Sequence, residues 1–110
     1  MKCKTTVEAG VCGFSTTIIA DSADDQNVTF TIESDCDKIK ALSQALPAVD
    51  AYQEIGTGFD GELLKTVRGN LGGCCAGCVV PVALFKSMQV AAKLALPRDI
   101  RLIIIKEEQS

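Results

Sequence analysis

Histidine is absent from all 110 residues of the sequence. Imidazole is the commonest general base and the usual partner of a serine or cysteine nucleophile, so its absence excludes those catalytic arrangements. The same absence excludes every metal site that mixes histidine with cysteine. We therefore predict no catalytic nucleophile with its own base, which makes an enzyme the less favoured class. Any metal ion must be held by thiolates, with carboxylates as the other available anions.

Long apolar runs and a basic excess are also missing. Residues 1–6 contain no apolar signal core, and the longest uncharged apolar runs are far shorter than a membrane span. Lysine and arginine number 11 against 14 aspartates and glutamates, a net charge of −3, so no basic field attracts nucleic acid or anionic lipid. We expect a cytoplasmic protein that binds neither nucleic acid nor membrane.

Cysteine, in contrast, is abundant, with six residues. A chain of this length buries roughly 65% of its unfolded surface and holds a core without cross-links. Thiols stay reduced in the cytoplasm, so six of them indicate metal binding or redox work before a disulfide framework. A secreted disulfide-bonded domain is the alternative.

The order of apolar and turn residues predicts a single α+β domain over residues 1–110. Three β-branched runs separated by turns, residues 5–9, 15–20 and 28–33, predict three strands in meander order. Residues 100–105 are too apolar and β-branched for a tail and predict a buried closing strand.

Helical spacing occupies the middle of the chain. The first predicted helix begins after an N-cap at Ser34 or Asp35 and ends before Pro47, and a weaker helical pattern covers residues 49–55. Two further helices are predicted, over residues 61–71 and from Pro81 to residue 96. The predicted order is β-β-β-α-α-α-β, with a four-stranded mixed or mostly antiparallel sheet and the helices on one face.

Connectivity predicts that three distant cysteines meet. Cys12 precedes the second strand and Cys36 follows the third, so both lie at one end of an antiparallel hairpin. If the closing strand runs parallel to the first, the last helix begins at that same end and brings Cys78 there. Cys75 or Cys74 is then close enough to be a fourth thiolate, and we choose Cys75 for its Cys-x-x-Cys spacing.

The predicted metal ligands are therefore Cys12, Cys36, Cys75 and Cys78. Thiols at helix starts experience a partial positive charge that favours the thiolate, the form that binds soft metals. Tetrahedral sulfur coordination suits zinc or an iron–sulfur cluster, and both stay open as the cofactor. A site with an exchangeable fourth position suits a scaffold or carrier better than a sealed structural site.

Two other interpretations stay open. The pair Cys75 and Cys78 at a helix start has the spacing of thiol oxidoreductases, with the first thiol as nucleophile and the second resolving. This thiol-disulfide or sulfur-transfer function leaves Cys12 and Cys36 unexplained. A structural zinc domain without catalysis is the third interpretation. Cys3, in or before the first strand, is predicted to be a packed apolar residue.

The cysteine layout resembles that of the IscU/NifU-type iron–sulfur scaffold proteins. The resemblance rests on Cys12 before strand two, Cys36 at a strand–helix junction and Cys78 at the last long helix. It implies a metal or cluster site at these three residues, and a sulfur or iron donor or acceptor protein as partner. The chain departs from that family at Phe14, where the family has aspartate, and at Gly77, where it has histidine.

Four short motifs resemble more closely a family of small uncharacterised proteins from anaerobic bacteria and archaea. This resemblance covers nearly the whole chain and implies an anaerobic source, in which exposed clusters and thiols survive, but it implies no activity. The motifs are Ala9-Gly10-Val11-Cys12-Gly13-Phe14, Glu33-Ser34-Asp35-Cys36, Cys78-Val79-Val80-Pro81 and Leu94-Ala95-Leu96-Pro97.

Overall fold

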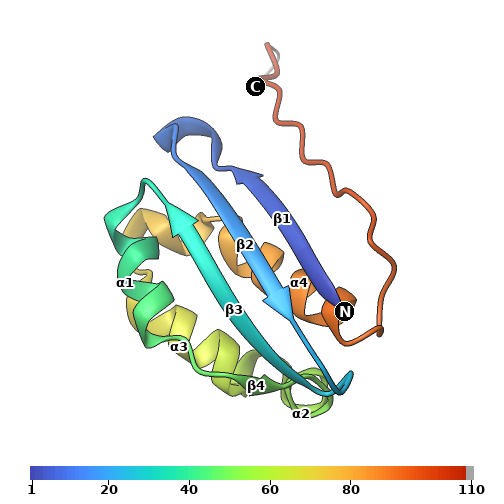
Figure 1. The fold of residues 1–110 in the computed structure, drawn as a ribbon. Coiled ribbons are helices and arrows are strands. Elements are labelled where there is room, and N and C mark those ends of the chain that lie inside the picture. The colour runs from blue at the N-terminus through green and yellow to red at the C-terminus, as the bar shows by residue number, and fades with distance from the viewer. Residues whose placement is uncertain (109–110) are drawn as a thin grey trace.

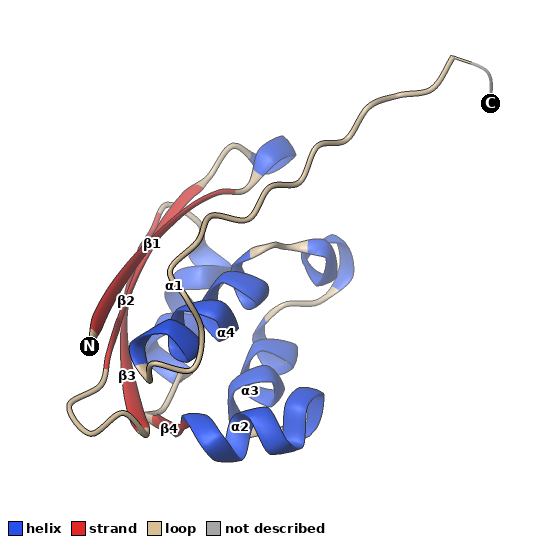
Figure 2. Ribbon diagram, turned by 90° about the vertical axis from the view of Figure 1, so that its right-hand side faces the viewer, coloured by secondary structure: helices blue, strands red, loops and turns tan. Residues whose placement is uncertain are grey.

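A four-stranded antiparallel sheet carries all the helices on one face (Figures 1 and 2). The structure is a computed structural model that describes residues 1–108. Its strands and α-helices are β1 (Lys2–Glu8), β2 (Ser15–Asp21), β3 (Asn27–Ser34), α1 (Asp37–Ala45), β4 (Val49–Asp50), α2 (Ala51–Thr57), α3 (Glu62–Asn70) and α4 (Val80–Ala91). Three short 3-10 turns are η1 (Gly10–Cys12), η2 (Gly58–Asp60) and η3 (Gly73–Gly77). The predicted α+β class and the three-strand meander are confirmed.

Every second side chain of a strand points towards the helices. In β2, Thr16, Ile18 and Ala20 are buried while the residues between them are less so, which is the two-residue period of a strand with one covered face. The pairing keeps this alternation in register, because Ile18 lies opposite both Thr5 of β1 and Ile32 of β3.

The predicted closing strand at residues 100–105 is wrong. These residues form no strand in the structure, and their apolar side chains are exposed. The fourth strand is instead the two-residue β4, in which Val49 pairs with Val28 of β3, so the sheet contains no parallel pair among the described residues. A β-branched composition fits a strand, but a strand also needs a hydrogen-bonding neighbour, which composition does not supply.

The last helix is shorter than its sequence pattern. It was expected to reach residue 96, but α4 ends at Ala91. Lys93 has a positive φ of 63°, and the Leu94 N–H donates to the Gln89 carbonyl at 2.8 Å, which is a left-handed helix termination. Pro97 therefore follows the helix end at a distance instead of setting it.

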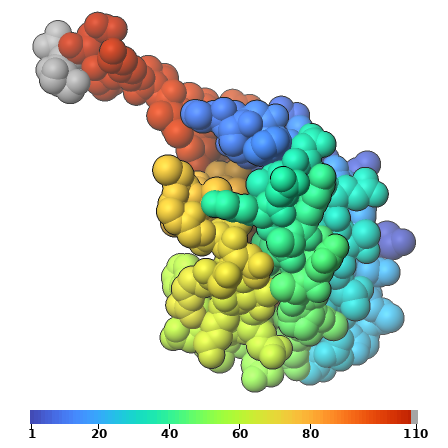
Figure 3. All heavy atoms as spheres, turned by 90° about the vertical axis from the view of Figure 1, so that its left-hand side faces the viewer, coloured from blue at the N-terminus to red at the C-terminus, as the bar shows by residue number. Residues whose placement is uncertain are grey.

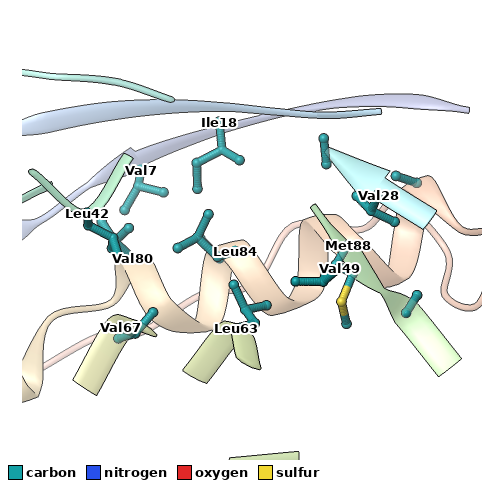
Figure 4. Close-up of a cluster of buried hydrophobic side chains, with 14 of the residues drawn as sticks. Val7, Ile18, Val28, Leu42, Val49, Leu63, Val67, Val80, Leu84 and Met88 are labelled. Carbon is teal, nitrogen blue, oxygen red and sulfur yellow. The ribbon is translucent and has the colours of Figure 1, made fainter. Parts of the chain in front are cut away.

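The core lies between the sheet and α4 (Figure 4). Leu84 and Met88 of α4 are fully buried and lie under Ile18 and Val28 of the sheet. Burying one side chain of this size contributes about 1.5–3 kcal/mol. Helices α1 and α3 complete the layer with the buried side chains Ile39, Leu42, Leu63 and Val67.

A hydroxyl pair between buried Ser87 and half-buried Thr5 joins α4 to the sheet. The Ser87 Oγ lies 2.6 Å from the Thr5 Oγ1 of β1, and it donates to the Ala83 carbonyl at 2.6 Å. Ser87 is 1% exposed, so this pair is satisfied within the protein.

The β2–β3 turn is held by one carboxylate. Asp24 Oδ1 accepts from the backbone N–H groups of Gln26 at 3.0 Å and Asn27 at 2.8 Å, and Oδ2 accepts from Asn27 Nδ2 at 2.8 Å. These bonds, the Asn27 side chain first, lower the pKa of Asp24 from 3.8 to about 2.

We predict that Asp24→Ala lowers the thermal unfolding midpoint at neutral pH. A depressed folded-state pKa means that the stabilisation is fully present above the ordinary pKa of 3.8 and is lost as the pH falls towards about 2. Thermal unfolding followed by circular dichroism should therefore show that the difference in unfolding midpoint between wild type and variant becomes smaller as the pH falls from 3.8 towards about 2. A difference in unfolding midpoint that stays constant down to a pH of about 2 would contradict the role of the carboxylate.

A second carboxyl group caps α3 from inside the protein. Glu54 of α2 is 3% exposed and accepts the N–H groups of Glu62 at 3.2 Å and Leu63 at 2.6 Å. These are two of the N–H groups that a helix start leaves without an internal partner. A Cβ at Gly61 would lie 2.7 Å from both Glu54 Oε1 and Thr57 Oγ1, so only glycine leaves room for this cap.

We predict that Gly61→Ala destabilises the protein by about 1–3 kcal/mol, because the added methyl displaces the capping carboxyl group. Gly56→Ala is the matched control, since a Cβ there meets nothing within 4 Å and lies within α2. The control should be stabilised by up to about 1 kcal/mol. Denaturant unfolding measures both changes, and equal behaviour of the two variants would refute the proposed cap.

Candidate functional site

Five of the six cysteines lie in three segments near one end of the sheet. Glu8 at the end of β1 pairs with Ser15 at the start of β2, so η1 with Cys12 lies there. The Asp35 N–H donates to the Ser15 carbonyl at 3.4 Å, which places Cys36 at the same end. This is the arrangement that the antiparallel hairpin predicts.

Cys36 is the N-cap of α1. The expected cap at Ser34 or Asp35 is wrong: Cys36 is in extended conformation, and its carbonyl accepts from the Lys40 N–H at 2.9 Å. Ser34 instead supports the residue before the helix, because its Oγ accepts the Cys36 N–H at 3.1 Å. The Cys36 side chain is half-buried and packs against the core.

The turn η3 brings Cys75 and Cys78 to the same region. Its backbone is closed by bonds from the Cys75 N–H to Gly72 and from the Cys78 N–H to Cys75, each at 3.1 Å. Both thiols are half-buried against the core, whereas Cys74 is exposed. Of the two adjacent cysteines, Cys75 is therefore the one directed towards the protein.

A contact between lysine and cysteine joins η3 to α1. Lys38 Nζ in the first turn of α1 donates to Cys75 Sγ at 3.4 Å, across 37 positions in the sequence. Figure 3 shows the gold η3 segment beside the green start of α1, with the blue β1–β2 turn at the upper end of the molecule. The last helix thus begins near Cys36, although the closing strand that was expected to direct it there does not form.

Cys12 lies further out than the other predicted ligands. It is exposed, and its Sγ is 4.0 Å from the Ala9 carbonyl. Gly10 and Gly13 on either side have φ values of +79° and +73°, a conformation that glycine adopts without strain. Nothing within 4 Å would meet a Cβ at either glycine, so η1 is a projecting turn.

A preformed metal centre is not present in residues 1–108. No three cysteine, aspartate or glutamate side chains there are grouped so that they could hold one metal ion. All six cysteines are free thiols. The structure brings Cys36, Cys75 and Cys78 to one region and leaves Cys12 at its rim.

Sequence reasoning missed Lys38. Its position two residues after Cys36 was visible, but the contact with Cys75 depends on how α1 and η3 pack, which spacing does not encode. Cys3 is half-buried near the opposite end of β1, where its Sγ lies 3.9 Å from Thr5 Oγ1. This agrees with a packing role for Cys3.

The stretch Gly73–Ala91 is long and apolar enough to cross a membrane by length and composition. The structure divides it into η3 and α4, with extended backbone at Cys78 between them. Leu84 and Met88 within it are fully buried beneath the sheet, so α4 is the core helix of a globular fold.

Comparison with known families decides the affiliation of the chain. A family model matches residues 3–104, a range that includes all six cysteines. The chain belongs to this family of unknown function, DUF6951. No curated protein and no solved structure matches the chain.

We predict that Lys38→Gln lowers the ratio of the alkylation rates of Cys75 by iodoacetate and by iodoacetamide, by about threefold. Both reagents attack the thiolate, so the thiolate fraction cancels and the ratio reports the local charge. Mass spectrometry of peptides gives the ratio for each cysteine, and Cys12 serves as the internal control. An unchanged ratio at Cys75 would mean that the Lys38 contact is not populated in solution.

Proposed function

We propose that this protein binds zinc or an iron–sulfur cluster through the thiolates of Cys36, Cys75 and Cys78, with Cys12 as the fourth ligand. The observation that carries the proposal is the Lys38 contact with Cys75, because it brings η3 to the helix start that follows Cys36. Three cysteine-bearing segments distant in the sequence then share one region. Cys12 and Cys74 are exposed, so core packing does not account for the whole group.

The donor set fits a soft metal or cluster. Thiolates are the preferred ligands of zinc and of iron in clusters, and the chain offers no imidazole that would favour another metal. Half-burial of the three inner thiols shields bound metal from water on the core side. The Lys38 ammonium offsets part of the negative charge that several thiolates bring to one metal.

Binding requires the site to close, since no three ligands are grouped for an ion in residues 1–108. The two cysteine-bearing turns are the parts that would move. η1 projects from the sheet between two glycines with positive φ, and η3 begins at Gly73, whose φ is +59°. A site that closes on its metal and opens again suits a scaffold or carrier, with a sulfur or iron donor or acceptor protein as its partner.

We place the protein in the cytoplasm. Six free thiols within one small domain, several of them at least partly accessible, persist where glutathione and thioredoxin keep cysteines reduced.

Thiol-disulfide exchange is the second candidate, and the Lys38 contact favours it too. The Cys75 thiolate would attack a disulfide of a partner protein and form a mixed disulfide, releasing one partner thiolate. The Cys78 thiolate would then displace the second partner sulfur. Two electrons pass from the cysteine pair to the partner, which leaves as a dithiol, and Cys75 and Cys78 become a disulfide.

We predict that protein purified without oxygen contains zinc, or iron with sulfide, and that Cys36→Ser, Cys75→Ser and Cys78→Ser each lower metal affinity by at least about tenfold. Cys3→Ser is the matched control, because this half-buried thiol lies away from the three segments and should leave the metal content unchanged. Elemental analysis and the visible spectrum identify the metal. Competition with a chelator gives the affinity.

The two candidates give different results in this experiment. Metal loss in the three inner variants supports the metal site, and the Cys12→Ser variant tests whether η1 supplies the fourth ligand. A metal-free protein in which Cys75 and Cys78 readily form a disulfide would replace the metal site with thiol exchange. Metal content that survives all three inner substitutions would contradict the metal site.

A further inference from the structure

Strand β1 is an open edge of the sheet. Within residues 1–108 it pairs only with β2, and the sheet order leaves its other side without a neighbouring strand. The Ala9 N–H donates to Phe14 and the Ser22 N–H donates to Met1, so the odd-numbered residues of β1 form the hydrogen-bonded pairs with β2. The N–H and C=O groups of the even-numbered residues therefore point to the open edge. These residues are Lys2, Lys4, Thr6 and Glu8.

The same chain carries a strand-like segment without a sheet. Residues 100–105 are β-branched or aliphatic apart from Arg101, and Ile104 is 88% exposed. Figure 1 shows the red C-terminal segment passing β1, and Figure 2 shows it leaving the body of the molecule. The apolar side chains of this segment are in contact with water, and burying them against a sheet would stabilise the protein.

A large hollow lies beside the open edge. Its volume is about 1080 Å³, and its walls are β1, α4 and the first part of the C-terminal segment. Val79 just before α4 and Ala83 and Val90 within it line the hollow, so a strand added to β1 would find apolar side chains below its inward side.

Charge and direction favour a second copy as the source of that strand. The segment of the same chain runs alongside β1 from its start towards its end, which is a parallel orientation (Figure 1). If the segment paired with β1 in this orientation from the start of the strand, Arg101 would fall beside Lys2 and Lys4, and these like charges would disfavour the pairing. In an antiparallel pairing, Arg101 can lie opposite Glu8 at the far end of β1, where the charges are opposite. The C-terminal segment of the same chain would have to turn back to run in this direction, whereas the segment of a second molecule would not.

One antiparallel register pairs the opposite charges on the outer face and points two aliphatic side chains inward. With Arg101 opposite Glu8, Leu102 falls opposite Val7 and Ile104 opposite Thr5. Val7 and Thr5 are the residues of β1 that face α4, so the two aliphatic side chains would fill the hollow.

We propose that residues 100–105 of one copy add as an antiparallel strand to the open edge of β1 in a second copy, and that the exchange is reciprocal. Each sheet then gains a fifth strand, and the inward side chains of each arm, Leu102 and Ile104, are buried in its partner. This interface is separate from the cysteine site, and either can be tested without the other.

Proline at Thr6 tests the edge directly. The Thr6 N–H points to the open edge, so Thr6→Pro removes a donor for the added strand but none of the β1–β2 bonds. Light scattering coupled to size exclusion should show a dimer for the wild type. We expect Thr6→Pro to raise the dimer dissociation constant at least about tenfold. Thr6→Val keeps the N–H and is the matched control, which should remain dimeric.

The arm and the register have their own variants. Leu102 is exposed in the single chain, so Leu102→Asp leaves the fold intact and should also weaken the dimer at least about tenfold. Glu8→Arg and Arg101→Glu should each weaken it by about threefold, and the double variant should restore it. This set keeps the proposal testable if Thr6→Pro fails to fold.

The contrary results are equally definite. A wild type that stays monomeric at every accessible concentration overturns the proposal. If hydrogen exchange then shows residues 100–105 protected in that monomer, the segment pairs within its own chain, and the proposal is overturned as well. A dimer that survives both Thr6→Pro and Leu102→Asp overturns it as well. Failure of the charge-swapped double variant to recover the dimer overturns the antiparallel register.

Discussion

The packing of α4 across β1 and β2 is the constraint on which the rest of the structure depends. Leu84 and Met88 are fully buried beneath the sheet, and the Ser87 hydroxyl meets Thr5 of β1 at 2.6 Å. Once the helix lies in this direction, the turn before it must lie at the end of the sheet where β1 and β3 finish. The position of Cys75 beside Lys38 follows from that orientation, and so does the exit of the C-terminal segment near the start of β1.

The spacing of apolar and turn residues was enough to predict the β2–β3 hairpin and the end of the sheet at which Cys12 and Cys36 lie. The alternation around Ile18 and the acidic turn at Asp24 identify the hairpin, and an antiparallel hairpin fixes Cys12 and Cys36 at one end. The closing strand failed because residues 100–105 have strand composition but no partner in the sheet. The Glu54 cap on α3 and the Lys38 contact escaped prediction for a related reason: each joins segments whose approach depends on tertiary packing.

The candidate site and the open edge lie in the same fold but arise from different properties of it. The thiol region exists because two cysteine-bearing turns and a helix start meet at one end, with the inner thiols half-buried and the outer one on a projecting turn. The edge exists because the described part of the chain places no strand on the outer side of β1. Membership of a family of unknown function decides neither feature, so the chemistry of the residues has to carry the functional argument.

The central claim is that α4 orients η3 against the start of α1 and so brings Cys75 to the region of Cys36. Nuclear Overhauser spectroscopy of the reduced protein tests it most directly, through the side-chain methylene protons of Lys38 and the β-protons of Cys75. The account predicts cross-peaks between these groups, since Nζ and Sγ are 3.4 Å apart. Cross-peaks that place Cys75 beside residues at the start of β1, with none to Lys38, would contradict it.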